Sequence, residues 1–443
     1  EVGHFHLYDL FTREGHVNED VFAYSNRSGE ERALVVYHNK YASTRGWVRS
    51  SVGYLGKTGK GEERALTQKD LGTALGLDPA GDHFTIFRDH MTGLEYIRNN
   101  RDLFDRGLYV ELGGFDCHVF LDFRQVRDND RKQYAQLAAS LDGRGVPNMD
   151  EALREIFLRP IHEPFKDLVN TGLFRQLLDA RVTKPEGLPT PALLDNVEQK
   201  THRLLCALKQ FSGGASDEAA LGRQVRQRLD AALALPILES RLAPPKGRAT
   251  KRKADLRAVA DFVKARLRDD PQRWDCLFGW LFIHALGKIV AETDAPQRSR
   301  SWIDEWRLGR IVAGTLRDLG LDPPAADRTV KLIGLLTTHQ DWFLQAGDEV
   351  HQALESLMKD GEVQQFLGVN RYQDIVWFNG GTLDELLSWL FLMAVVQICA
   401  DPLRPGTEPA EQIAHYFGTL RSLQEAVQQA EHQVEKLLAP AER

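Results

Sequence analysis

The spacing of apolar side chains along the chain changes near residue 128. Before that point, residues 21–27 alternate aromatic and polar side chains, residues 33–39 form a short β-branched run, and the turn Ser28-Gly29-Glu30-Glu31 separates the two. Alternation with a period of two is typical of β-strands, and two such runs joined by a glycine-containing turn predict a hairpin. Further runs predict strands at 47–54, 83–88, 107–112 and 117–123. We therefore expect residues 1–128 to form an antiparallel β-sandwich.

From residue 129 onward, apolar side chains recur every three or four positions. Leu204, Leu205 and Leu208 fall on one side of such a pattern, which is typical of amphipathic helices. Prolines gather near 185–191 and 236–245, where they predict connections between helices. No repeat of fixed length is visible, which argues against a regular solenoid. The second part is expected to be a large irregular all-α region, divided into 129–245 and 246–443, so the fold class is α+β.

Composition narrows the class of protein. The 443 residues are 42% apolar and 27% charged, which excludes a largely disordered, fibrous or polytopic membrane protein. The most apolar stretches are 274–291, interrupted by charged residues, and 386–400, which is too short to span a bilayer. Both are predicted to be helices buried in a core, and no membrane is expected as a partner.

The charge pattern bears on nucleic acid binding. The net charge is -7, so no global positive field attracts a polyanion. One basic run, 246–268, contains Lys251, Arg252 and Lys253 and would be the candidate for phosphate contacts. The run has no interleaved tryptophan or tyrosine and carries an apolar stripe, which favours a solvated helix face. We expect no nucleic acid partner.

No motif for a metal, cofactor or nucleophile is recognisable. The chain lacks an HExxH pattern, a P-loop and a GxGxxG fingerprint, and it contains no CxxC pair. His4, His6 and His16 lie near one another in sequence, but three histidines close to a chain end are more often unliganded. We expect no cofactor and no metal. The four cysteines are widely spaced, which indicates reduced thiols and a cytoplasmic location.

Two passages resemble a known family. Residues 20–27 with the run 34–39 look like the start of the C-terminal sandwich of α-amylase-family glycoside hydrolases, and 107–112 with 118–121 look like the strand pair that ends it. Residues 366–371 and 377–379 are also similar to the tails of large bacterial members. The resemblance implies a C-terminal region, a β-sandwich with a helical extension, that supports a catalytic barrel in the same parent polypeptide.

The catalytic residues of that family have no counterpart in this sequence. The family uses an aspartate nucleophile, a glutamate acid/base and a second aspartate on a (β/α)8 barrel, because one carboxyl protonates the leaving oxygen while another attacks the sugar. The chain has neither the alternating βα pattern of a barrel nor the Gly-x-Arg-x-Asp spacing around the nucleophile. No catalytic residue is expected here. The first residue is Glu1 rather than Met, which favours a piece of a longer polypeptide.

Aromatic residues in the first part suggest a contact with sugar. Trp47, Tyr41 and Tyr54 lie close together in sequence, and exposed rings can stack on the faces of glucose units. Packing between strands explains the same residues, so an α-glucan contact is one of two interpretations.

A second function class remains open, a stand-alone helical interaction protein with a β-sandwich module and no enzyme. The amylase interpretation predicts an exposed apolar patch near 1–27 where a barrel docks, whereas the alternative predicts a polar surface there.

Overall fold

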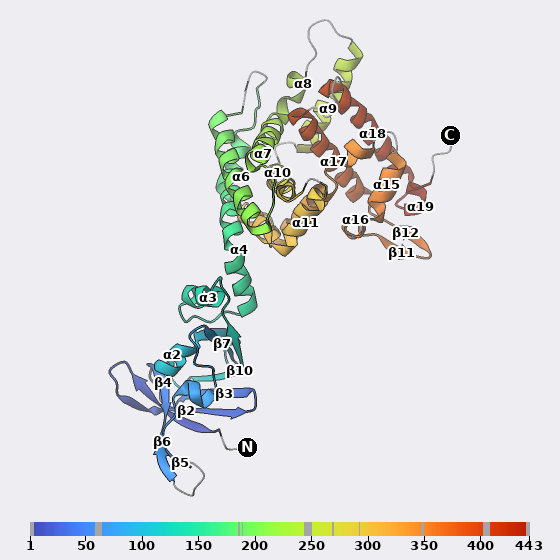
Figure 1. Ribbon diagram of the computed structural model, residues 1–443. Helices are drawn as coiled ribbons and strands as arrows, with labels where there is room; N and C mark the ends of the chain where they lie inside the picture. The colour runs from blue at the N-terminus through green and yellow to red at the C-terminus, as the bar shows by residue number, and fades with distance from the viewer. Residues whose placement is uncertain are drawn as a thin grey trace. The chain divides into compact units, whose positions relative to one another are not determined.

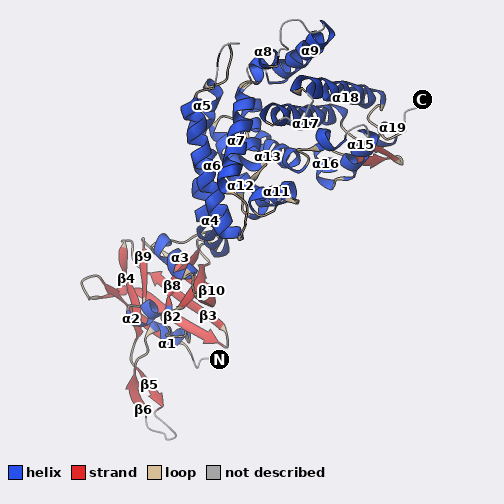
Figure 2. Ribbon diagram, turned by 45° about the horizontal axis from the view of Figure 1, so that its top comes forward, coloured by secondary structure: helices blue, strands red, loops and turns tan. Residues whose placement is uncertain are grey.

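The computed structural model describes residues 4–57, 64–184, 187, 189–242, 250–267, 270–291, 293–346, 350–401 and 408–439. The chain divides into two compact units, Glu1–Arg159 and Pro160–Arg443 (Figure 1). The first unit contains an antiparallel sheet and the second is mostly helical (Figure 2), which confirms the predicted α+β class.

The first unit contains a curled sheet of eight strands in the order β8-β7-β10-β3-β2-β1-β4-β9. Its strands are β1 (His6–Thr12), β2 (Val17–Ser28), β3 (Glu31–His38), β4 (Thr44–Ser51), β7 (His83–Asp89), β8 (Glu95–Asn99), β9 (Leu108–Leu112) and β10 (Cys117–Arg127). A separate hairpin is formed by β5 (Tyr54–Lys57) and β6 (Arg64–Thr67). The helices of this unit are α1 (Leu71–Leu75), α2 (Asn100–Asp105) and α3 (Gln133–Leu141).

The predicted hairpin is confirmed as β2 and β3. The two strands pair antiparallel as far as Ser28 and Glu31, and Gly29 takes a left-handed φ of 60° in the turn. Residues that face each other across antiparallel strands point to the same side of the sheet. One side buries Leu10, Leu34 and Val36 in a core that α1 and α2 cover.

The other side of the sheet, called here the outer face, is covered at one end only. Phe84 and Ile86 of β7 and Ile97 of β8 pack there against Leu137 of α3 and against Met149. Phe87 of β7 lies in the core on the opposite side, so β7 is buried on both faces. The outer face is therefore packed at the β7–β8 edge of the sheet. The strands farther along the sheet order lie beyond the part that α3 covers.

The second unit is built from helices and one small hairpin. Helix α4 (Met149–Leu168) begins in the first unit and ends in the second. The remaining elements are α5 (Thr171–Asp179), α6 (Pro191–Ser212), α7 (Glu218–Leu233), the 3-10 helix η1 (Leu235–Ile237), α8 (Leu238–Arg241), α9 (Thr250–Leu267), α10 (Pro271–Ile283), the 3-10 helix η2 (Leu286–Ile289), α11 (Ala295–Glu305), α12 (Leu308–Asp318), α13 (Pro323–Thr338), α14 (Trp342–Ala346), α15 (Val350–Lys359), α16 (Gly361–Phe366), β11 (Asn370–Tyr372), β12 (Ile375–Trp377), α17 (Gly380–Ala400), α18 (Pro409–Gln429) and α19 (Val434–Leu437).

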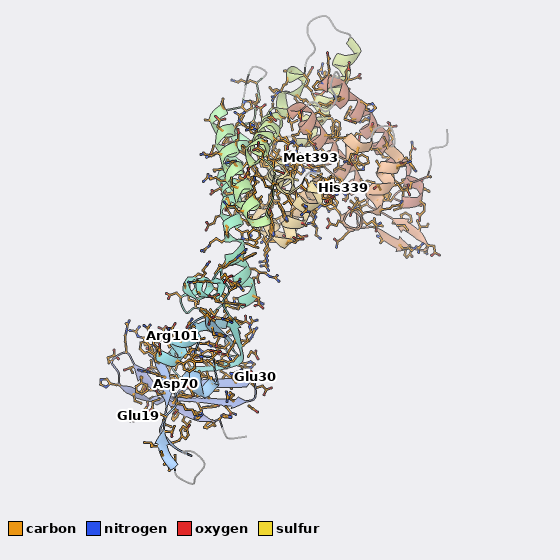
Figure 3. The ribbon with its side chains drawn as sticks, viewed as in Figure 1. Glu19, Glu30, Asp70, Arg101, His339 and Met393 are labelled. Atoms are coloured by element: carbon orange, nitrogen blue, oxygen red, sulfur yellow. The ribbon has the colours of Figure 1, made fainter. Side chains whose placement is uncertain are left out.

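Helix α17 lies in the core of the helical unit. Met393, marked in Figure 3, has no exposed surface, and the ring of Phe391 packs against Phe262, Phe343 and Phe417. Among the described residues, α17 is the helix that is long and apolar enough to cross a membrane. Of its most apolar 18-residue stretch, 78% is buried inside the protein. Helix α10 is buried almost throughout as well. The two stretches predicted as core helices are therefore confirmed.

Candidate functional site

The outer face of the sheet remains apolar beyond the region that α3 covers. Across four strands, Leu7 of β1 faces Tyr24 of β2, Tyr24 faces Val35 of β3, and Val35 faces Val119 of β10. These four side chains lie on one side because each pair is in direct register. Leu7 is 50% exposed and Tyr24 is 37% exposed, so this row is open to solvent.

Neighbouring rows extend the same apolar surface. Phe22 faces Tyr37 across β2 and β3, and the Phe22 side chain is 56% exposed. In the other direction Trp47 lies between Phe11 and Tyr109, with its ring centre 4.9 Å from that of Tyr109. We call these residues the outer apolar patch: Leu7, Phe11, Phe22, Tyr24, Val35, Tyr37, Trp47, Tyr109 and Val119.

A patch of this kind is unusual for a solvated face. An antiparallel sheet with one face on a core normally carries polar side chains on the other. Contiguous exposed apolar surface marks sites of protein contact or ligand binding. At the β7–β8 end the outer face is already packed by α3, so the same surface accepts a covering layer where one is present. No described residue covers the outer apolar patch to the same degree.

A second exposed feature is an aromatic pair on two connecting loops. Tyr41, between β3 and β4, is 88% exposed, and Phe115, between β9 and β10, is 56% exposed. Their ring centres lie 6.2 Å apart with an interplanar angle of 35°. Two exposed rings tilted in this way form a small apolar surface.

The two loops are fixed to each other by hydrogen bonds. The amide of Phe115 donates to the carbonyl of Lys40 at 3.1 Å, and Nδ1 of His38 lies 2.8 Å from the carbonyl oxygen of Gly113. The Lys40 ammonium pairs with Asp20 at 2.7 Å. Phe115 has a left-handed φ of 56°, which a bulky side chain adopts only where the surroundings impose it.

The three residues predicted to touch glucan lie in different environments. Tyr41 belongs to the exposed pair, Trp47 is half-buried in the outer apolar patch, and Tyr54 of β5 lies with its ring centre 5.3 Å from that of His6. Among the described residues no ring contact joins any two of the three. Phe115 was missed by the sequence analysis, although an aromatic residue directly after Gly113-Gly114 was the available signal.

The histidines near the N-terminus show no arrangement for a metal. His6 is 6% exposed, and burial lowers its pKa, so the ring belongs to a packed environment. Over the described ranges, no group of three histidine, cysteine, aspartate or glutamate side chains is placed to hold an ion.

The helical unit contains a polar pocket around His339, which Figure 3 marks. Its volume is about 930 Å3, and its walls include Asp341, Trp342 and Asp360. Nε2 of His339 lies 3.0 Å from an Asp360 oxygen, and burial lowers the pKa of this histidine although Asp360 opposes the shift. The other Asp360 oxygen accepts from backbone amides at the start of α16, so Asp360 also caps a helix. The described hydrogen bonds join no hydroxyl or thiol to His339.

The basic run is only partly described. The side chains of Lys251, Arg252 and Lys253 lie outside the described residues. Farther along α9, Arg257 is 73% exposed and lies 4.0 Å from Asp261 one turn later. That geometry is typical of a solvated helix face.

Comparisons with protein-family models, with curated proteins and with solved structures find no match for this chain. The outer apolar patch and the aromatic pair are therefore the features that bear on function.

Proposed function

We propose that this chain is the non-catalytic C-terminal part of an α-amylase-family enzyme of α-glucan metabolism. In this proposal a barrel that precedes residue 1 hydrolyses or transfers α-1,4-glucosidic bonds, and the outer apolar patch packs against that barrel. The observation that carries the proposal is the uncovered apolar face of the sheet, because the docking interpretation requires such a surface near residues 1–27. The resemblance of 20–39 and 107–121 to the C-terminal sandwich of the family supports the identity of the occupant.

Burial of the outer apolar patch would stabilise docking of a second domain. Full burial of a large apolar side chain contributes roughly 1.5–3 kcal/mol. Leu7, Phe22 and Tyr24 are each about half exposed, so covering each one contributes about 1 kcal/mol. Because the patch has nine members, its burial against a barrel is worth several kcal/mol.

The proposal includes a reducing location and a sugar contact. The four cysteines are free thiols, as expected in the cytoplasm. The exposed pair of Tyr41 and Phe115 gives the sheet a place where a glucan chain can stack while the barrel acts on it.

The first test is the size of the native polypeptide. An antibody raised against this chain is used on extracts of the source cells, and the recovered band is assayed for cleavage or transfer of α-1,4-glucan. A band far above 50 kDa that carries this activity supports the proposal. A band at 50 kDa without activity overturns it and favours the stand-alone interaction protein, whose partner would then occupy the patch.

The second test addresses the patch itself in the native polypeptide. The double substitution Phe22→Thr with Tyr24→Thr places β-branched residues, which suit a strand, in β2 while it removes two exposed rings. We expect the variant to release the barrel, seen as faster proteolysis between the domains and lower thermal stability of the activity. The matched control is Met91→Thr, at a residue that is 60% exposed in the β7–β8 turn and outside the patch. Equal behaviour of the two variants would contradict docking through this face.

A further inference from the structure

The helical unit contains a second pocket, of about 990 Å3, which differs in character from the one around His339. Its walls come from the second half of α9, the start of α10, η1 and the segment that follows α5. All four elements belong to the same compact unit. The volume is at the upper end of the range for small-molecule sites.

The charged side chains that line this pocket are mostly cationic, and most of the other lining residues are apolar. Among the described lining residues, the cations are Arg181, Lys264, Arg266 and Arg273, and the carboxylate is Asp270. Arg181 and Arg273 are 92 positions apart in sequence, so the fold brings these cations together and a local basic run does not. Nearby, Asp384 partly neutralises Arg266, with 3.5 Å between Nη2 and a carboxylate oxygen. Among the described lining residues, cations still outnumber carboxylates.

Arg181 and Arg273 are held in place by their neighbours. Arg181 donates from Nε to the carbonyl of Leu178 at 2.6 Å, and its guanidinium carbon lies 5.1 Å from the ring centre of Trp274. Arg273 pairs with Asp270 at 3.4 Å and donates to the backbone carbonyl of Arg266. Side chains fixed in this way lose little further freedom when they bind a ligand.

Donors remain available after these contacts are made. The Nε of Arg266 is buried and has no hydrogen-bond partner, and burial lowers the pKa of this guanidinium. Lys264 is exposed, and no ion pair to it is found among the described residues. The Arg266 Nε has almost no accessible surface, so a donor open to a ligand is the exposed Lys264 ammonium, from which an oxyanion in the pocket would accept a hydrogen bond.

We propose that this cationic pocket binds a small molecule through a dianionic oxyanion group of the phosphate type. Arginine forks and a lysine ammonium suit such a group, which accepts several charge-assisted hydrogen bonds at once. The pocket is larger than the anion alone, so the remainder of the ligand lies along the apolar side of the cavity formed by Leu235 and Pro236.

The test is calorimetric titration of the whole chain with inorganic phosphate and with pyrophosphate, at constant ionic strength maintained with sodium chloride. We expect both probes to bind, and Arg181→Gln and Lys264→Gln each to weaken binding roughly tenfold, because each removes a charged donor. Arg181→Lys keeps the charge and is expected to restore part of the affinity. Circular dichroism of each variant shows whether the helices are intact.

Two further variants test whether affinity rises when negative charge is removed from the pocket, and whether a cation outside the pocket matters. Asp270→Asn removes the carboxylate in the pocket but retains a side chain that caps α10, so it should tighten binding about threefold. Arg257→Gln removes an exposed cation from the same helix outside the pocket and should leave binding unchanged.

The proposal is overturned by absence of binding, by weaker binding in Asp270→Asn, or by an equal loss in Arg257→Gln. A further arm uses a single-stranded oligonucleotide. If the oligonucleotide binds more tightly than pyrophosphate and loses affinity in Arg257→Gln, the surface binds nucleic acid and the small-molecule site is wrong.

Discussion

The sheet unit and the helical unit place their apolar side chains differently. In the helical unit, Phe391 and Met393 of α17 have no exposed surface and are enclosed by other helices. In the sheet unit, Phe22 and Leu7 are about half exposed on a face that is packed only at one end. The helical unit thus buries these apolar side chains within itself, whereas the sheet unit leaves an apolar face exposed that a partner could cover.

The two units also shift the pKa of a buried carboxylate in opposite directions. Asp89 of β7 is fully buried; burial raises its pKa, but hydrogen bonds from His118, Thr92 and two backbone amides outweigh that effect and lower it. Asp275 of α10 is 4% exposed, and burial together with the nearby Asp270 raises its pKa to about 7. The sheet holds an ionised carboxylate, while the helical core holds one that is protonated at mildly acidic pH.

The largest expected effect compares the two apolar environments directly. Phe391→Ala empties the centre of an aromatic cluster formed with Phe262, Phe343 and Phe417, and should lower the free energy of unfolding by about 3–5 kcal/mol. Phe22→Ala removes a half-exposed ring and should cost under about 1 kcal/mol. Urea unfolding followed by circular dichroism at 222 nm measures both. Comparable losses would mean that the sheet face contributes to stability within this chain.

The next largest effect, roughly 2–4 kcal/mol in the free energy of unfolding, is the pH dependence contributed by Asp275. Because the folded-state pKa of Asp275 lies above the unfolded value of 3.8, its stabilising contribution is complete below pH 4 and is lost as the pH rises through 7. Asp275→Asn should therefore match the parent chain at pH 4 and be more stable at pH 8. The comparison is made on the difference between the two chains, because the buried His284, whose pKa is lowered, destabilises both chains as the pH falls below 6.5. Parallel stability curves would contradict the assignment.

Asp89 is expected to behave in the opposite way. Its lowered pKa contributes stability above pH 4 that is lost as the pH falls through the folded-state value. Asp89→Asn replaces an acceptor of four hydrogen bonds by a group with two donors of its own, and should cost about 1–3 kcal/mol at pH 7. Hydrogen exchange of the β7 and β10 amides isolates this change from the helical unit. Unchanged exchange would mean that the carboxylate does not stabilise the sheet.

Local patterns predicted a hairpin and an amphipathic helix. The β2–β3 hairpin follows from two strand-like runs joined by a glycine-containing turn, and helix α6 follows from the spacing of Leu204, Leu205 and Leu208. Strand β1 was not predicted, because Leu7 and Phe11 make its outer side apolar as well and the period of two disappears. The property that makes the outer apolar patch a candidate site therefore also conceals one of its strands.

The site residues depend on contacts that no local pattern contains. Strand β1 lies between β2 and β4, and this order brings Phe11 opposite Trp47. The cationic pocket joins Arg181 with Arg273, which belong to different helical stretches and to no shared motif. Sequence patterns indicated that aromatic residues of the first part merit attention, but only the paired loops distinguish Tyr41 from Trp47 and Tyr54.

The smallest expected effect separates sugar binding from docking on the sheet unit. Tyr41→Ala should weaken binding of maltoheptaose by about 1 kcal/mol, or roughly fivefold, because it removes one ring of the exposed pair from a stacking contact. Phe115→Gly should have a similar effect while it relieves the left-handed φ of the turn. Affinity electrophoresis in gels that contain soluble glucan measures both variants at once.

The matched control for the sugar contact is Tyr372→Ala, because Tyr372 is 65% exposed in the β11–β12 hairpin of the helical unit. Retarded migration that Tyr41→Ala abolishes and Tyr372→Ala preserves would assign glucan contact to the loop pair. If Phe22→Thr with Tyr24→Thr abolishes it instead, the outer apolar patch is the sugar surface. The sheet would then need no barrel to cover it, since bound glucan would take the place of a docked domain.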